Sequence, residues 1–168
     1  MKEEAEPFPH APVDQPGPGP EGPGDPVLLV EDDLEALQLL RDFVAADGYA
    51  VEACSHPGEA LERLRERTFS CIVSDHYMPG MDGLSFLAEA AREQPLGTRI
   101  LITGAASLDV AVKALNSGVV YHFLTKPWST NELTAVLRHA VARYHLKVEN
   151  QELHRRTVEL NKLLESAN

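Results

Sequence analysis

The sequence predicts an α/β fold in which five parallel strands alternate with helices that cover both faces of the sheet. Two observations carry this prediction. Short apolar runs alternate with amphipathic segments from residue 27 to residue 145, and the connections between them are short. Four of the apolar runs also lead into a charged or hydroxyl residue, and sheets of this type bind ligands at the carboxyl ends of their strands.

The predicted elements follow one another in a strict strand-helix order. Strands are expected at 27–31, 49–54, 70–75, 99–103 and 119–124, and helices at 33–46, 57–67, 83–94, 107–117 and from 130 onward. The first helix is followed by Gly48, a typical C-cap. Pro57 suits the first turn of the second helix, and Ser129 with Glu132 forms a capping box before the last helix.

Polar residues stand where four of the strands are expected to end. They are Glu31, Asp32 and Asp33 after the first strand, Asp75 at the third, Thr103 at the fourth and Lys126 after the fifth. Because Pro and Gly in the loop 76–83 stop the third strand, Asp75 is placed at its carboxyl end. Repulsion among converging carboxylates would raise their pKa values unless a cation joins them. Mg²⁺ prefers oxygen ligands and accompanies phosphoryl groups, so the pattern indicates a magnesium site for phosphate chemistry.

In this order the motifs resemble the receiver domain of bacterial two-component response regulators, of the kind with a Lys-Pro-Trp motif and a long C-terminal helix. The resemblance covers roughly residues 26–145. Its motifs are Leu28-Leu29-Val30-Glu31-Asp32-Asp33, Asp75 with Met78-Pro79-Gly80-Met81-Asp82-Gly83, Thr103-Gly104, and Lys126-Pro127-Trp128. The resemblance implies a flavodoxin-like (βα)5 sheet of strand order 2-1-3-4-5. Some receivers of this kind are fused to cyclic-dinucleotide modules, and none is expected within these 168 residues.

The same resemblance implies roles for individual residues. Asp75 would accept a phosphoryl group from a histidine kinase, and Lys126 would pair with the phosphoryl oxygens. The Mg²⁺ ligands would be the side chains of Glu31, Asp32 and Asp75 and the backbone carbonyl of Tyr77. Thr103 and Phe123 would form the switch that responds to the phosphoryl group. The Lys126–Pro127 bond would be cis.

Several of these residues also have purely structural interpretations. Asp33 is expected to cap the next helix, and Asp82 before Gly83 is typical of a turn. His76 is expected to be a solvated loop histidine, since no Cys or His stands at metal-ligand spacing from it. Thr103 could be a plain strand end and Phe123 a plain core ring.

The N-terminal head, residues 1–26, differs in composition from the rest of the chain. It holds eight of the twelve prolines, four glycines and six acidic residues against the single Lys2. Such a segment cannot bury enough apolar surface to offset its ordering entropy. We predict a disordered, partly polyproline-like tail, with a ligand for a proline-recognition module as the alternative.

Composition excludes several classes of protein. A formal charge of -11 argues against binding to nucleic acid, which needs a basic face. The start of the chain lacks the features of a secretory signal, and no apolar stretch is long enough to span a membrane, so a cytoplasmic protein is expected. Cys54 and Cys71 fall in strands that the first strand would separate, so core thiols rather than a disulfide are predicted.

The last helix continues beyond what a receiver needs. An a/d pattern with alternating spacings of four and three runs through Leu146, Asn150, Leu153, Thr157, Leu160, Leu164 and Ala167. We predict a coiled-coil extension over residues 146–168 after a receiver domain at 27–145. The expected partner is a second copy in a parallel homodimer, with Asn150 fixing the register. The alternative is a frayed amphipathic helix or a linker.

The sequence therefore predicts a phosphorylatable receiver that acts through protein contacts and is not a turnover enzyme. One alternative is a receiver-like scaffold or dimerisation module that functions without phosphorylation. A second is a phosphatase with Asp75 as nucleophile. Such phosphatases need an acid two residues further on as proton donor, where this chain has Tyr77.

Overall fold

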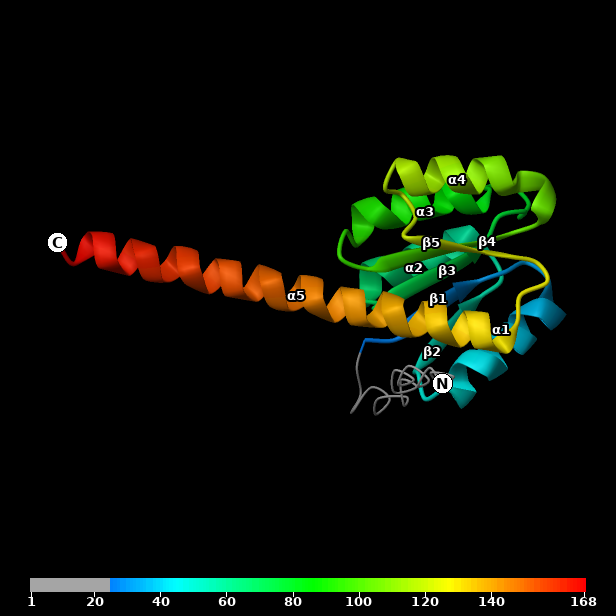
Figure 1. Ribbon diagram of the computed structural model, residues 1–168, viewed down its shortest axis with the longest axis horizontal. Coiled ribbons are helices and arrows are strands. Elements are labelled where there is room, and N and C mark those ends of the chain that lie inside the picture. The colour runs from blue at the N-terminus through cyan, green and yellow to red at the C-terminus, as the bar shows by residue number, and fades with distance from the viewer. Residues whose placement is uncertain (1–24) are drawn as a thin grey trace, which may run out of the picture.

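A computed structural model describes residues 25–168 of the chain and shows a five-stranded parallel sheet (Figure 1). The strands are β1 (Val27–Val30), β2 (Val51–Cys54), β3 (Cys71–Asp75), β4 (Thr98–Thr103) and β5 (His122–Thr125). The helices are α1 (Leu34–Ala46), α2 (Pro57–Glu66), α3 (Gly83–Glu93), α4 (Leu108–Asn116) and α5 (Thr130–Ser166), with a 3-10 turn η1 (Ala105–Ser107) before α4. The strand order is β2-β1-β3-β4-β5, which confirms the predicted topology. Apart from Asp25 and Pro26, the predicted head lies outside the described residues.

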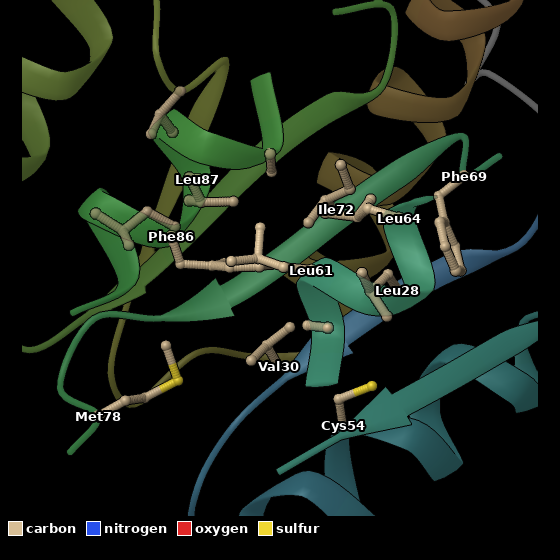
Figure 2. Close-up of a cluster of buried hydrophobic side chains, with 14 of the residues drawn as sticks. Leu28, Val30, Cys54, Leu61, Leu64, Phe69, Ile72, Met78, Phe86 and Leu87 are labelled. Carbon is tan, nitrogen blue, oxygen red and sulfur yellow. The ribbon is translucent and has the colours of Figure 1, made fainter. Parts of the chain in front are cut away.

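Each face of the sheet carries its own apolar core. Figure 2 shows the cluster beneath α2 and α3, where Phe86 and Leu87 of α3 and Leu61 of α2 point toward Ile72 on β3. On the other face, α1 and the first part of α5 cover side chains that alternate with these along the strands, such as Val73 next to Ile72. β1 and β3 are buried on both faces, so their sequences read as continuous apolar runs.

Cys54 and Cys71 are both buried and free, on strands that lie on either side of β1. Burial raises the pKa of the Cys54 thiol to about 11. Burial also raises the pKa of the Cys71 thiol. The prediction of core thiols is therefore confirmed.

The predicted helix signals form the expected contacts. Asp33 accepts hydrogen bonds from the amides of Glu35 and Ala36 as the N-cap of α1. Gly48 after α1 has a positive φ of 94°, a conformation that favours glycine. Ser129 and Glu132 form both hydrogen bonds of the capping box before α5. The Lys126–Pro127 peptide bond is cis.

The start of β5 differs from the prediction by three residues, since the strand begins at His122 rather than 119. The reason is a side chain far away in the sequence. Arg99 donates to the carbonyls of Val119 at 2.6 Å and, more weakly, Gly118 at 3.5 Å. These carbonyls therefore bond to a guanidinium rather than to a neighbouring strand. Other boundaries agree within one or two residues, which is the usual uncertainty of helix and strand ends.

Helix α5 is continuous for 37 residues, through the predicted domain boundary at 145/146 and beyond (Figure 1). Its first part is packed on the sheet through Leu133, Val136, Leu137, Ala140, Val141 and Tyr144. No side chain of α5 after Tyr144 is buried. Within residues 25–168, none of the helices combines the length and the apolar character that crossing a bilayer requires.

Candidate phosphoacceptor site

Three carboxylates converge at the carboxyl edge of the sheet, as the sequence predicts. Glu31 and Asp32 directly follow β1, and Asp75 is the last residue of the neighbouring strand β3. One oxygen from each lies within 4.8 Å of the others. Glu31 and Asp75 are about 5 % exposed, while Asp32 is more open to solvent. The site thus combines two buried acids with one accessible acid.

Lys126 places a positive charge against this cluster from the loop between β5 and α5. Its ammonium nitrogen lies 2.8 Å from Oδ1 of Asp75 and 3.7 Å from Oε2 of Glu31. A backbone hydrogen bond holds Lys126 at this position, because its amide donates to the carbonyl of Thr103 at 2.8 Å. The predicted convergence of the acids with Lys126 is therefore present in the structure.

The surroundings of Glu31 strongly change the pKa of its carboxyl group. Burial and the nearby charge of Asp75 raise the pKa of Glu31 to about 7, although a hydrogen bond from the Asp33 amide opposes this rise. Burial lowers the pKa of Lys126, but its hydrogen bond to Asp75 and the charges of both acids raise it overall. One ammonium group is therefore too little positive charge for three carboxylates.

The donor set fits a hard divalent cation. In an octahedral Mg²⁺ site with bonds of about 2.1 Å, opposite ligand oxygens are about 4.2 Å apart. The 4.8 Å limit on the separation of the three carboxylate oxygens is only slightly larger. Within residues 25–168, Lys126 is the cation paired with this cluster, so three ionised carboxylates would leave a net negative charge at the same place. The side chains of Glu31, Asp32 and Asp75 could therefore hold the ion after small rotations.

Thr103 and Phe123, the predicted switch residues, occupy different surroundings. Thr103 is buried at the end of β4, one residue beyond Ile102, which pairs with Asp75. Its hydroxyl is 3.4 Å from the carbonyl of Gly104. Phe123 is partly buried in β5 and packs against the core beneath α2 and α3, away from the carboxylates. Thr103 follows Leu101, the β4 partner of Phe123, by two residues, so both switch residues lie on the same face of the sheet, with Thr103 nearer its carboxyl edge.

Tyr77 makes a contact that the sequence interpretation did not include. The prediction concerned only its backbone carbonyl. In the structure its hydroxyl is hydrogen-bonded to the hydroxyl of Ser107, a buried residue of η1, although the tyrosine itself is 61 % exposed. The contact links the loop after β3 to the turn before α4. A pair 30 residues apart leaves no local pattern by which the sequence could have revealed it.

The expectation for His76 is wrong. The residue is buried, with 9 % exposure, and its Nδ1 has no hydrogen-bond partner among the described residues. Its backbone amide donates to the carbonyl of Ile102 at 2.9 Å, so pairing with β4 continues one residue past the end of β3. His76 therefore continues the strand instead of belonging to a solvated loop.

Asp82 and Gly83 have more definite roles than a general turn. Asp82 is the N-cap of α3 and accepts a hydrogen bond of 2.7 Å from the amide of Ser85, which lowers its pKa. A Cβ on Gly83 would lie 2.0 Å from the backbone oxygen of Asp75. Only glycine allows α3 to start this close to the end of β3.

A hollow lies beside the acidic cluster, between α1 and the loop that carries Lys126. It has a volume of about 770 Å³, and Glu31 and Lys126 line one side. Most of the other lining side chains are apolar. They include Leu39, which is 53 % exposed, and an edge-to-face pair of Phe43 and Trp128 with ring centroids 5.7 Å apart. An apolar surface thus adjoins the charged site.

Comparisons with known proteins agree with this architecture. The sequence pattern of the response regulator receiver domain matches residues 27–138. The transcriptional regulatory protein ZraR of Escherichia coli is 32 % identical over 120 residues, which are 71 % of this chain and 27 % of that protein. The DNA-binding transcriptional regulator NtrC of Escherichia coli is 33 % identical over 135 residues, or 80 % of this chain and 28 % of that protein.

A solved structure shows the same likeness in three dimensions. It is the signal receiver domain of an HD domain-containing protein from Pseudomonas fluorescens, with a TM-score of 0.69 and 34 % identity over 74 % of this chain and 93 % of that one. The chain belongs to the response regulator receiver domain family. It spans a little more than a quarter of the length of the two curated relatives.

Proposed function

We propose that this chain is a response regulator receiver that accepts a phosphoryl group on Asp75 from a histidine kinase, with Mg²⁺ as cofactor. The observation that carries the proposal is the environment of Asp75. Its buried carboxylate lies 2.8 Å from the ammonium of Lys126 and within 4.8 Å of oxygens from Glu31 and Asp32. An Asp carboxylate with these neighbours is suited to act as a nucleophile and to form an aspartyl phosphate.

The proposed transfer needs few protein groups. A carboxylate oxygen of Asp75 attacks the phosphorus of the donor, an O–P bond forms, and the P–N bond to the kinase imidazole breaks. Lys126 stabilises the negative charge on the phosphoryl oxygens. A Mg²⁺ ion held by Glu31, Asp32, Asp75 and the backbone carbonyl of Tyr77 would neutralise the same oxygens. The protein is proposed to act as a receiver and not as a turnover enzyme.

The phosphodonor is proposed to dock on the hollow beside Lys126. This surface combines exposed Leu39 with the rings of Phe43 and Trp128, and it opens directly onto Glu31 and Lys126. Contact with an apolar face would bring a phosphohistidine next to Asp75 and exclude water from the transfer. A cytoplasmic location and an output through protein contacts belong to the same proposal.

The response is proposed to pass through Thr103, Phe123 and the Tyr77–Ser107 contact. A phosphoryl group on Asp75 adds acceptor oxygens near the buried hydroxyl of Thr103. Movement of Thr103 toward them would displace the turn η1, where Ser107 binds Tyr77. Phe123 is only partly buried, so its ring has room to change its packing. Its two states would differ in packing alone, since it has no hydroxyl.

The extension of α5 is proposed to form a parallel coiled coil with a second copy. A helix turns by about 100° per residue, so Leu146, Leu153 and Leu160 lie about 160–200° around the axis from Tyr144. Tyr144 marks the face that packs on the sheet. The leucines therefore face away from the domain, and each is more than 50 % exposed. A second helix in register would cover them and place Asn150 opposite its counterpart.

Phosphorylation by a small donor tests the central claim. The full chain, treated with acetyl phosphate and Mg²⁺, is expected to gain one phosphoryl group by mass spectrometry, and Asp75→Asn none. Equal labelling of the variant would refute the proposal. Steady multi-turnover hydrolysis of a generic phosphate ester would instead support the phosphatase alternative. Unchanged signalling by Asp75→Asn, with loss on removal of residues 146–168, would support the scaffold alternative.

A further inference from the structure

Three cations meet at the end of the sheet opposite the acidic cluster, in a chain whose formal charge is -11. They surround a hollow of about 210 Å³ where α5 passes the amino ends of β4 and β5. Arg99 comes from β4, and Arg143 and Lys147 come from successive turns of α5. Neither the phosphoacceptor site nor the leucine face of α5 uses this group.

Contacts with residues that line the hollow hold two of the three cations in place. The guanidinium of Arg99 donates to the carbonyls of Val119 at 2.6 Å and Gly97 at 2.9 Å. The guanidinium of Arg143 lies over the ring of Tyr121, 4.6 Å from its centroid. A ligand would therefore meet charges whose positions are already set, which lowers the entropy cost of binding.

The positive charge is not balanced within residues 25–168. None of the three side chains forms an ion pair with a carboxylate there. Arg143 and Lys147 are like charges one helical turn apart, an arrangement that destabilises a helix. Burial, together with the charges of Arg143 and Arg99, lowers the pKa of Lys147. Burial and the charge of Arg143 likewise lower the pKa of Arg99.

The hollow has the size of a compact anion. Pockets for drug-sized ligands usually measure about 300–1,000 Å³, more than is available here. A volume of 210 Å³ corresponds to roughly seven water molecules at about 30 Å³ each. Guanidinium groups pair with phosphate oxygens through two parallel hydrogen bonds, and lysine adds a point charge.

We propose that Arg99, Arg143 and Lys147 form a binding site for a phosphate group, either inorganic phosphate or the phosphate of a small metabolite. The bound group would join α5 to β4 and to the turn that precedes β5. It would therefore stabilise the segment of α5 that leads into the exposed extension. The site is independent of Asp75, so Asp75→Asn is expected to keep it.

Thermal unfolding of the full chain tests this proposal in the presence of a chelator, with ionic strength held constant. Phosphate at about ten times its Kd is expected to raise the Tm by about 4–5 °C. Lys147→Gln is expected to lose most of this rise. Arg138→Gln removes the same charge from an exposed position on the same helix and is expected to keep it. Phosphate also stabilises proteins because it is excluded from their surface, but this effect should be the same in the wild-type protein and in both variants.

The same rise in wild type and Lys147→Gln would overturn the proposal. A lower Tm of Lys147→Gln without phosphate would overturn it too, because the ammonium would then already be paired within the chain. Phosphate-dependent shifts of the Gly118 and Tyr121 amide resonances, with none at Gly80, would support the site. A nucleoside monophosphate that binds more tightly than phosphate would identify a metabolite as the source.

Discussion

The hydroxyl of Tyr77 is hydrogen-bonded to the hydroxyl of Ser107, and this contact joins the loop after β3 to the turn before α4. Tyr77 follows Asp75 by two residues, and Ser107 follows Thr103 by four. The contact therefore joins the two segments that a phosphoryl group on Asp75 is proposed to move. Its partners differ in exposure, because Ser107 is buried and the Tyr77 ring is largely open to solvent.

Tyr77→Phe is predicted to loosen the turn η1 without unfolding the domain. A hydrogen bond of this kind contributes about 0.5–1.5 kcal/mol, which corresponds to about a 2- to 13-fold increase in local opening. Amide hydrogen exchange of residues 104–108 is the measurement. Tyr121→Phe removes a tyrosine hydroxyl at the opposite end of the sheet and should leave this exchange unchanged. If both variants behave like wild type, the contact does not restrain the turn.

Glu31→Gln is predicted to stabilise the metal-free protein at pH 8 and to have little effect at pH 5. The pKa of Glu31 rises from 4.5 to about 7 in the fold, so its contribution to stability is present below about pH 4.5 and is lost as the pH rises through 7. The loss amounts to about 3 kcal/mol between these limits. Urea unfolding in the presence of a chelator measures it, and a pH-independent difference between the two proteins would contradict the prediction.

Lys126→Ala is predicted to separate metal binding from phosphoryl transfer. Loss of the ammonium removes a charge that competes with Mg²⁺ for Asp75 and Glu31, so the Mg²⁺ affinity should rise. Transfer from acetyl phosphate should fall on the order of 100-fold, since a group that stabilises the transferring oxygens is missing. Trp128, the single tryptophan, lines the same hollow as Glu31 and Lys126, so its fluorescence is expected to change when Mg²⁺ binds and is the measurement of affinity. The exposed Lys113→Ala serves as control and should change neither quantity.

Gly83→Ala is predicted to destabilise the domain by about 2–4 kcal/mol. The new Cβ would meet the backbone oxygen of Asp75 at 2.0 Å and the Cα of His76 at 2.8 Å, and neither is part of a flexible side chain. The matched control is Gly58→Ala in α2, where a Cβ has nothing within 4 Å. That substitution should stabilise slightly, because alanine favours helices. Equal unfolding midpoints for the two variants would show that the start of α3 can move away.

Leu153→Glu is predicted to convert a dimer to a monomer, as measured by sedimentation equilibrium. Leu153 is 52 % exposed and lies on the leucine face of α5. A charge on this face would have to be buried in the interface at high cost. Val158→Glu changes an exposed residue of the same helix on roughly the opposite side and should leave the dimer intact. A wild-type monomer at all concentrations would rule out the coiled coil.

Much of the fold and site could be predicted because the signals are local. The buried strands β1 and β3 are continuous apolar runs that end at Glu31 and Asp75, and parallel pairing brings these ends together. The cap at Asp33 also depends only on neighbours within three residues. Local sequence was therefore sufficient to place the carboxylates at one edge of the sheet.

The features that escaped prediction depend on contacts between distant segments. The start of β5 is set by Arg99, about twenty residues earlier, and the partner of Tyr77 is 30 residues later. His76 looked like a loop residue because it follows Asp75, but pairing with the carbonyl of Ile102 continues through it. The coiled coil and the metal ligands stay predictions, since they involve a second chain and an ion.

The unbroken course of α5 has a mechanical consequence. The 22 residues from His145 to Ser166 form a continuous helical arm of about 33 Å, and the helix is not interrupted at its base. A tilt of about 5° at Tyr144 would displace its tip by about 3 Å. A small change in how α5 packs on the sheet would therefore move the far end of the helix by several ångströms.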